Sequence, residues 1–408
     1  MKEALALLAL AAALAAAVVR DRRAPEAIVA LAAAGVLLLA GAISWHDAVA
    51  EARALGPTIA VLAALLVLGD GCERAGLFEA LAARMAARAQ GSATRMLGLV
   101  FAAACAVTAV LGLDATVVLL TPAVFAAVAR ARLPGRPHVY ACTHLANSAS
   151  LLLPISNLTN LLAVRSAGIS FTRFAVLMVL PWAVAISVEW VALRRAFAAE
   201  LAVGREVPPD DPGRLPRVPL YVLAGTLAGF VLAGALGIDA AWPAAAGALA
   251  MLVLSARPSP RRLLAAVDLP LLGFVLGLGV IVKAVADHGL GDVVASVLPS
   301  GAGVLALIGA AFVAAIAANL LNNVPALLVL LPAAVASGPA TVCAVLIGVN
   351  AGPNLTYTGS LATLLWRRVV RAHGAEPPHG EFLKLGAVTV PPILIGATVA
   401  LWLAVQLT

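Results

Sequence analysis

The chain has 408 residues, of which 63% are hydrophobic and 12% are charged, and its formal net charge is +7. Soluble proteins carry about 25% charged residues, and one core buries only part of a chain this long. The composition therefore excludes a water-soluble globular protein.

The basic residues are almost all Arg and lie in short clusters between apolar runs. This pattern is typical of cytoplasmic loops and excludes nucleic acid as a partner, since no basic face with interleaved aromatic residues is present.

Apolar runs long enough to cross a bilayer, about 20 residues, recur along the whole sequence. They dominate over the short alternating runs of membrane barrels, so we expect an all-α polytopic membrane protein embedded in a lipid bilayer. In chain order, the runs cover residues 4–19, 25–44, 56–70, 96–112, 116–130, 138–165, 172–192, 218–236, 242–256, 266–286, 302–320, 324–336, 340–366 and 386–406.

At two places, consecutive apolar runs are joined by very few residues. These pairs are residues 96–112 with 116–130, and residues 302–320 with 324–336. Each pair could form two short spans or a re-entrant hairpin, because both options return the chain to the same face. We interpret the pairs as hairpins, which predicts about ten transmembrane helices plus two re-entrant hairpins.

The two halves of the chain repeat one another. The first half contains LDATVVLLTPAV and then ANSASLLLPISNLTN, and the second contains LNNVPALLVLLPAAV and then GVNAGPNLTYTGSLAT. Matching residues lie roughly 200 positions apart, which is typical of an internal repeat: Pro122 and Pro332, Asn147 and Asn350, Ser156 and Thr358. We predict a first inverted repeat with broken helices at residues 1–193, a cytoplasmic linker at 194–217 and a second inverted repeat at 218–408.

The Arg clusters also predict orientation, because cytoplasmic loops are enriched in basic residues. The clusters within residues 20–23, 74–95, 130–136 and 367–371 all fall on one side when the runs are counted as above. Arg165 and Arg173 are the exception on the other side, where the loop 45–55 holds a single Arg. We therefore expect a multi-pass protein of the bacterial inner membrane, with both termini in the periplasm.

Two polar segments interrupt apolar runs and are the strongest candidates for a substrate site. In the first, Pro154 disfavours a continuous helix, and four polar side chains follow it: Ser156, Asn157, Thr159 and Asn160. The second repeats the pattern with Asn350, Gly352, Pro353, Asn354, Thr356, Thr358, Gly359, Ser360 and Thr363. Polar groups and unwound backbone at membrane depth are tolerated where they line a cavity or are buried in protein. The alternative is that these residues only pack helices together.

Asp114 lies at the tip of the first hairpin, and a carboxylate in the bilayer is costly unless it has a function. Together with Thr116 it is our candidate for binding a coupling cation or a proton. The alternative is that it caps the start of a helix, and both roles are compatible. The matching tip of the second hairpin is polar but uncharged, with Asn322 and Asn323.

Four cysteines are scattered without CxxC spacing, so we expect no disulfide or zinc framework. Cys142 and Cys343 occupy similar positions in the two halves. Such a pair would suit a thiophilic ligand such as trivalent arsenic, and packing as small apolar residues is the simpler interpretation. No catalytic residue, metal site or cofactor is predicted.

The hairpin and broken-helix motifs, above all TGSLATLLW, resemble those of the arsenite/antimonite efflux permeases of the ArsB type, in the ion transporter superfamily. The resemblance covers roughly residues 96–195 and 268–402. It implies export of As(OH)₃ or Sb(OH)₃ by proton antiport or with a soluble ATPase partner, and superfamily analogy implies a homodimer. The functional positions it implies are Asp114, Asn147, Ser148, Ser156, Asn157, Asn160, Asn322, Asn323, Asn350, Gly352, Thr358 and Ser360.

The sequence departs from the family at two points. Leu113 stands where the family commonly has Asn directly before the Asp. The related dicarboxylate/sodium symporters carry a Ser-Asn-Thr type motif in both halves, whereas the second half here has Ser360-Leu361-Ala362. No Arg lies within residues 151–160 or 350–363 to hold a carboxylate, which favours a neutral substrate.

We therefore predict a secondary active transporter that exports arsenite or antimonite by proton antiport, with Asp114 as the coupling group. A cation/proton antiporter or an organic-anion symporter of the same superfamily is the alternative. An intramembrane hydrolase is a remote one. Residues 289–292 match the GxGD pattern of intramembrane aspartyl proteases, but the chain has no Tyr-Asp partner motif.

Overall fold

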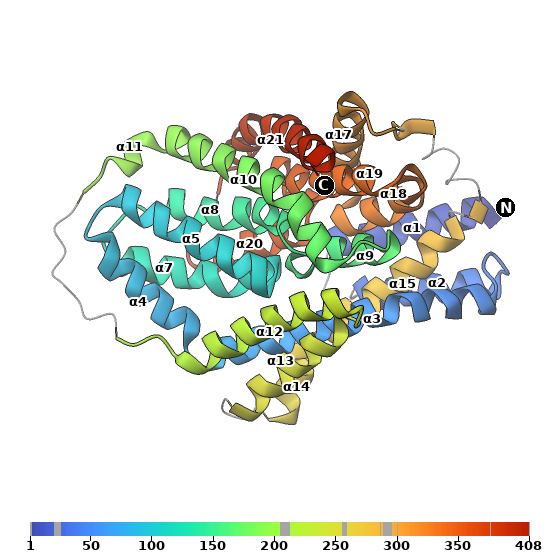
Figure 1. Ribbon diagram of the computed structural model, residues 1–408, viewed down its shortest axis with the longest axis horizontal. Helices are drawn as coiled ribbons and strands as arrows, with labels where there is room; N and C mark the ends of the chain where they lie inside the picture. Colours follow the sequence, from blue (N-terminus) through green and yellow to red (C-terminus); the bar gives the residue numbers. More distant parts are fainter. Residues whose placement is uncertain are drawn as a thin grey trace.

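The computed structural model describes residues 2–19, 26–204, 213–254, 259–285, 287–288, 296–299, 301–375 and 377–407. The Arg-rich segment 20–23, residues 205–212 of the predicted linker and the GxGD pattern at 289–292 lie outside these residues. The described residues form helices and no β-strand (Figure 1). The predicted all-α polytopic fold is confirmed.

The first half of the chain contains fourteen named helical segments. They are α1 (Lys2–Val19), α2 (Glu26–Leu39), α3 (Trp45–Arg74), α4 (Leu77–Ala89), α5 (Ala93–Leu111), α6 (Leu113–Ala115), η1 (Thr116–Leu120), α7 (Thr121–Arg130), α8 (Arg136–Ser148), η2 (Ala149–Leu151), η3 (Pro154–Ser156), α9 (Leu158–Ser166), α10 (Phe171–Ala196) and α11 (Ala198–Leu201).

The second half repeats this order from α12 onward. Its segments are α12 (Arg217–Leu236), α13 (Ala241–Leu254), α14 (Pro260–Val267), α15 (Leu269–Val285), α17 (Val304–Leu321), α18 (Asn323–Ser337), α19 (Pro339–Ala351), η5 (Gly352–Leu355), η6 (Tyr357–Gly359), α20 (Leu361–Ala372) and α21 (His379–Leu407).

Eight of the described helices are long and apolar enough to cross a membrane. Three of them are arms of the predicted hairpins, namely Ala93–Leu111, Leu113–Arg130 and Val304–Leu321. The described residues also form shorter apolar helices, among them the remaining hairpin arm, Asn323–Ser337. Because the arms have lengths near the minimum for a span, the choice between re-entrant hairpins and short spans stays a prediction.

The two hairpins have the same backbone conformation at their tips. In the first, α5 ends at Gly112, which has φ 86° and ψ 169°. In the second, α17 ends at Asn322, which has φ 78° and ψ 155°. Only Gly, and less often Asn, adopts positive φ at low cost. The matching geometry makes Gly112 and Asn322 equivalent, so that Asn323 corresponds to Leu113 and Val324 to Asp114.

The two broken helices are also equivalent residue by residue. Asn157 caps α9 with φ −153° and ψ 144°, and Ser360 caps α20 with φ −148° and ψ 144°. This equivalence places Ser156 with Gly359, one residue from the partner Thr358 that the sequence pattern predicts.

The broken helices run in opposite directions through the centre of the molecule. α8 packs against α20, and α9 packs against α19, so the first part of each broken helix lies beside the second part of the other (Figure 1). The first hairpin packs on α8 and α20 through η1, whereas α18 of the second hairpin packs on α9 and α19. This antiparallel arrangement is the one that inverted repeats produce.

Close approach of α17 and α19 fixes one broken helix in place. A Cβ added to Gly348 of α19 would overlap the carbonyl oxygen of Ala311 and the side chain of Ala314. Because the obstructing atoms include backbone, the two helices would have to separate.

We expect Gly348→Ala to lower the free energy of unfolding by about 1–3 kcal/mol, the usual effect of overpacking a core. Thermal unfolding of the purified protein in detergent measures the change. Gly35→Ala in α2 is the matched control, because nothing lies within 4 Å of its added Cβ. Equal melting temperatures for the two variants would contradict this account of the packing.

Candidate functional site

The side-chain amide of Asn350 joins the two broken helices. Its Oδ1 accepts hydrogen bonds from Asn157 Nδ2 at 2.9 Å and from Thr159 Oγ1 at 2.6 Å. Its Nδ2 donates to Asn160 Oδ1 at 2.7 Å. All four side chains are buried. One residue of the second half thus satisfies three polar side chains of the first.

Asn160 in turn holds the unwound segment of its own half. Its Nδ2 donates to the carbonyl oxygens of Ser150 at 2.7 Å and Leu153 at 3.0 Å. These carbonyls lie where 3₁₀ turns replace the α-helix, and that of Leu153 also accepts from the backbone N–H of Ser156 at 3.1 Å. Polar groups inside the hydrocarbon region must find partners within the protein, and Asn160 supplies them.

A second bridge between the halves is made by Asn354, which follows the break in the second half. Its Oδ1 accepts from Asn147 Nδ2 at 2.8 Å, and its Nδ2 donates to Ser148 Oγ at 2.9 Å and to Glu189 Oε1 at 2.9 Å. Asn147 also donates to Thr363 Oγ1 at 3.2 Å. The two bridges together tie both broken helices to each other and to α10.

Glu189 carries the charge in this buried network. Its Oε2 lies 2.9 Å from Nδ1 of His144, and its Oε1 accepts from Ser148 Oγ at 2.9 Å. The side chains of Glu189 and His144 are both 0% exposed. The sequence interpretation missed Glu189. The signal was present, because it is a carboxylate within a long apolar run, the same argument that singles out Asp114.

A cavity of about 70 Å³ lies where the two hairpin tips meet the caps of the two half-helices. Its polar lining comes from Asp114 and Asn323 at the tips, and from Ser156, Asn157 and Ser360 at the breaks. The rest of the lining is glycine and apolar residues, and the one charged residue among those that line it is Asp114. Half-helix N-termini carry partial positive charge, so α9 and α20 favour oxygen lone pairs in this cavity.

A second cavity, of about 230 Å³, adjoins the first. The two share Leu65, Leu111, Asp114, Leu271 and Leu361 among their lining residues. The second continues to the ends of α3 and α14, where it is lined by Asp70, Glu73 and Asp268. Asp70 is paired with Arg74 at 2.7 Å and with Arg262 at 3.4 Å. The cavity therefore connects Asp114 with the end of the molecule that the Arg pattern predicts to be cytoplasmic.

The predicted site residues thus divide into three groups. The first group lines the cavity: Asp114, Ser156, Asn157, Asn323 and Ser360. The second forms the buried bridges: Asn147, Ser148, Thr159, Asn160, Asn350 and Asn354. The third lies elsewhere: Thr116, Asn322, Gly352, Thr358 and Gly359.

The third group has structural partners of its own. Thr116 Oγ1 lies 2.7 Å from Thr108 Oγ1, inside the first hairpin. Asn322 Nδ2 donates to the Thr358 carbonyl at 3.2 Å. A Cβ at Gly352 would lie 2.7 Å from that of Ala315, and one at Gly359 would lie 2.7 Å from Pro353 Cα.

Asn319 is a second residue that the sequence interpretation missed. Its Nδ2 donates to the carbonyls of Ala315 at 2.8 Å and Gly352 at 2.9 Å, and its Oδ1 accepts from Thr356 Oγ1 at 2.7 Å. It joins the second hairpin to the break in the same half. The signal was an amide in the last turn of an apolar run.

The two cysteines do not reach the cavity. Cys142 and Cys343 are both fully buried, and neither lines the two cavities described above. Cys142 Sγ lies 3.5 Å from the carbonyl of His138 in its own helix. Their placement favours the packing interpretation over a thiol ligand site.

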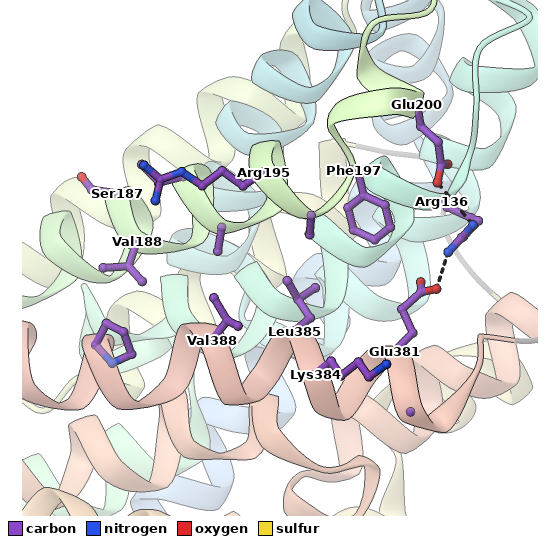
Figure 2. Close-up of a pocket in the computed structure, with 15 residues that line it drawn as sticks. Arg136, Ser187, Val188, Arg195, Phe197, Glu200, Glu381, Lys384, Leu385 and Val388 are labelled. Atoms are coloured by element: carbon purple, nitrogen blue, oxygen red, sulfur yellow. Dashed lines mark hydrogen bonds and ion pairs between the residues drawn. The ribbon is translucent and has the colours of Figure 1, made fainter.

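A cavity larger than these two lies away from the polar cluster (Figure 2). It is a groove of about 1120 Å³ between α10 and the start of α21. Val188, Val191 and Val388 line its apolar part. At one end Arg136 pairs with Glu200 at 3.3 Å and with Glu381. Both carboxylates belong to the groove lining, and no residue of the two hairpin tips contributes to it.

Inverted broken helices, two hairpin tips and a polar cavity at their meeting point define a membrane transporter rather than an enzyme. A profile of the citrate transporter family (CitMHS) matches residues 6–363. The chain belongs to this family.

Relatives of known name agree with that class. The chain is 28% identical over 372 residues to the arsenical pump membrane protein of Escherichia coli K12, covering 86% of each chain. It is 26% identical over 398 residues to the protein of the same name from Yersinia enterocolitica, covering 92% of each. The solved structure of the YdaH transporter of Alcanivorax borkumensis has a similar fold, with a TM-score of 0.60, 16% identity, and coverage of 88% of this chain and 87% of that one.

Removing the Asn350 amide should destabilise the fold, because its partners would be left buried without hydrogen bonds. We expect Asn350→Ala to cost roughly 1–3 kcal/mol for each buried group so orphaned. Thermal unfolding of the purified protein is the measurement.

Ser187→Ala is the control, since its exposed hydroxyl donates only to Ala183 of the same helix, at 2.7 Å. Equal melting temperatures for Asn350→Ala and Ser187→Ala would mean that the bridge does not hold the halves together.

Proposed function

We propose that this transporter exports arsenite or antimonite as the neutral trihydroxide, driven by proton antiport. The observation that carries the proposal is the chemistry of the central cavity. It offers hydroxyl and amide groups from both halves, one carboxylate, and no cationic side chain among its described lining residues. Neutral hydroxides donate and accept hydrogen bonds, and Ser and Asn side chains do the same.

The cavity's size supports the same cargo. The cavity is small, at about 70 Å³, and As(OH)₃, with one arsenic and three oxygens, is a small solute. A tricarboxylate is much larger and would require cationic partners to offset the cost of desolvating its charges. The names of the E. coli and Yersinia relatives agree with a metalloid cargo.

Asp114 is the proposed proton-coupling residue. It lines both adjoining cavities, at the point where the route toward α3 and α14 meets the substrate site. A carboxylate there can hold a proton in one state and release it in the other. In the proposal, the hairpins and broken helices move against the remaining helices to open the site to each side in turn.

The proposal places the chain in the bacterial inner membrane with both termini in the periplasm, as the Arg pattern predicts. It also includes assembly as a homodimer, by analogy with the superfamily. A soluble ATPase docked on the Arg-rich cytoplasmic loops is an alternative energy source, and it enters the test below.

An organic-anion symporter is the second candidate, favoured by the description of the matching family as citrate transporters. The absence of Arg, Lys and His from the described cavity lining argues against it. The two candidates make opposite predictions for the same vesicles.

The test is arsenite uptake into everted vesicles with an imposed proton gradient. We expect gradient-driven accumulation by the wild type, and a loss of about tenfold or more in Asp114→Asn, within the range of ordinary coupling free energies. Asp239→Asn is the isosteric control, because Asp239 lies in the α12–α13 loop and pairs with Arg165 at 2.8 Å. It should accumulate arsenite as the wild type does.

No arsenite movement by the wild type, with either a gradient or an ATPase partner supplied, would overturn the cargo assignment. Gradient-driven accumulation of citrate in the same vesicles would favour the symporter instead.

A further inference from the structure

The buried pair of His144 and Glu189 is not explained by the cavity. Neither residue lines it, and both side chains have no exposed surface. An acidic side chain inside a membrane domain is costly and marks a functional position by default. A purely structural pair would be expected to satisfy all its polar atoms.

His144 does not meet that expectation. Its Nδ1 is bound to Glu189 at 2.9 Å, but its Nε2 is buried without a hydrogen-bond partner in the described structure. The imidazole can therefore gain or lose a proton at Nε2 without breaking any bond to the protein. When Nε2 carries no proton and one proton lies between Nδ1 and Oε2, the net charge of the pair is negative by one. A proton taken up from water onto the Nε2 lone pair makes it neutral.

Groups on the same helix do not neutralise the pair. The nearest ionisable residues of α8 are His138, Tyr140 and Cys142. The ring nitrogens of His138 lie 2.8 Å and 3.0 Å from the carbonyl oxygens of Pro134 and Ala93, and Cys142 is directed at a backbone carbonyl. None of them bonds to the pair.

Neighbouring helices also present neutral groups to it. From α21, the ring of Phe382 lies 5.7 Å from that of His144, centroid to centroid. The charged residues Glu381 and Lys384 of the same helix line the groove of Figure 2 instead. From α20, Arg367 lies over the ring of Tyr357 at 4.9 Å. The other titratable or charged groups on α8 and on helices that pack against it are these: Arg136 of α8, Arg95 and Cys105 of α5, Asp114 of α6, Arg130 of α7, Arg173, Arg194 and Arg195 of α10, Cys343 of α19, and Arg368 and Arg371 of α20. On α21, which packs against α10, His379 is a further one.

The Phe382 ring that lies beside His144 belongs to the helix that borders the groove of Figure 2. Its helix neighbours Glu381 and Leu385 both line that groove. Figure 2 shows Glu381 beside Arg136 at the charged end of the groove. The pair therefore lies beside the turn of α21 that borders the charged end of the groove.

The pair is linked directly to the bridge between the broken helices. Glu189 Oε1 accepts from Asn354 Nδ2 and from Ser148 Oγ, both at 2.9 Å. Hydrogen bonds to an ionised acceptor are roughly twice as strong as neutral ones. A proton on Nε2 makes the imidazole cationic and draws the carboxylate's electron density toward Oε2. This weakens the hold of Oε1 on Asn354, which in turn holds Asn147 of the other broken helix.

We propose that His144 and Glu189 form a second proton-binding site, distinct from Asp114, whose occupancy sets the strength of the Asn354 bridge. The proposal rests on the proton-driven transport proposed above. Glu189 acts here as a positioning residue, because it acts on the substrate site through Asn354. The step is a proton transfer alone, in which one N–H bond forms on uptake and breaks on release.

The first test does not need a substrate. Infrared difference spectroscopy of the purified full-length protein follows carboxyl and carboxylate bands as the pH is changed. We expect a wild-type band change that is lost in Glu189→Gln and kept in His138→Gln, a matched loss of a buried histidine from the same helix. Superimposable wild-type and Glu189→Gln difference spectra would overturn the proposal.

Glu189→Asp keeps the test decisive where Glu189→Gln does not fold. The aspartate retains a carboxylate in a shifted position, so its difference band should shift. An unshifted band would assign the signal to another group and overturn the proposal.

The second test separates coupling from structure in vesicles. Glu189→Gln should lose the dependence of arsenite accumulation on the proton gradient by about tenfold, while arsenite exchange without a gradient continues. His138→Gln should keep both. Loss of both activities in Glu189→Gln would make the pair structural and contradict the proposal. Wild-type protein that shows the infrared signal yet moves no arsenite would overturn the proposed cargo and leave this proton site standing.

Discussion

Hydrogen bonding of the Asn350 amide is the interaction on which the rest of the site depends. Breaking two helices inside a membrane exposes backbone carbonyls and polar side chains that lipid cannot satisfy. Asn350 meets this requirement across the halves, through Asn157, Thr159 and Asn160. Because the breaks are held by each other, the caps Asn157 and Ser360 are placed at one cavity. A site that belongs to both halves follows from this mutual satisfaction.

The same network separates two tasks that the polar residues perform. The side-chain amides of Asn350 and Asn354 bond at both oxygen and nitrogen to other protein groups, so they are scaffold. Ser156, Asn157, Asn323 and Ser360 line the cavity and can contact a solute. Movement of either broken helix relative to the other must exchange bridge hydrogen bonds. The bridges are therefore where a protonation event can act on the conformational equilibrium of the transporter, as any differential interaction with two states does.

Much of this architecture could be predicted from the sequence. Pro154 and the Gly352-Pro353 pair mark both breaks, and the short linkers after Leu111 and Leu321 mark both hairpin tips. These signals are local, because they depend on backbone preferences of single residues. The pairing of side chains is not local. Nothing in the sequence distinguishes Asn350, which bonds to the other half, from Asn323, which faces the cavity. Glu189 has a local signal, a carboxylate within an apolar run, but its partners are not local. His144 lies on another helix of the same half, and Asn354 lies in the other half.

The most direct test of a neutral-solute site between the hairpin tips and the half-helix caps is to locate the bound metalloid. Anomalous diffraction or electron cryo-microscopy of the full-length protein with antimonite would do so, because antimony is a strong scatterer. The account predicts antimony in the cavity bounded by Asp114, Asn157, Asn323 and Ser360. Antimony bound at Cys142 and Cys343, or in the groove between α10 and α21, would contradict it.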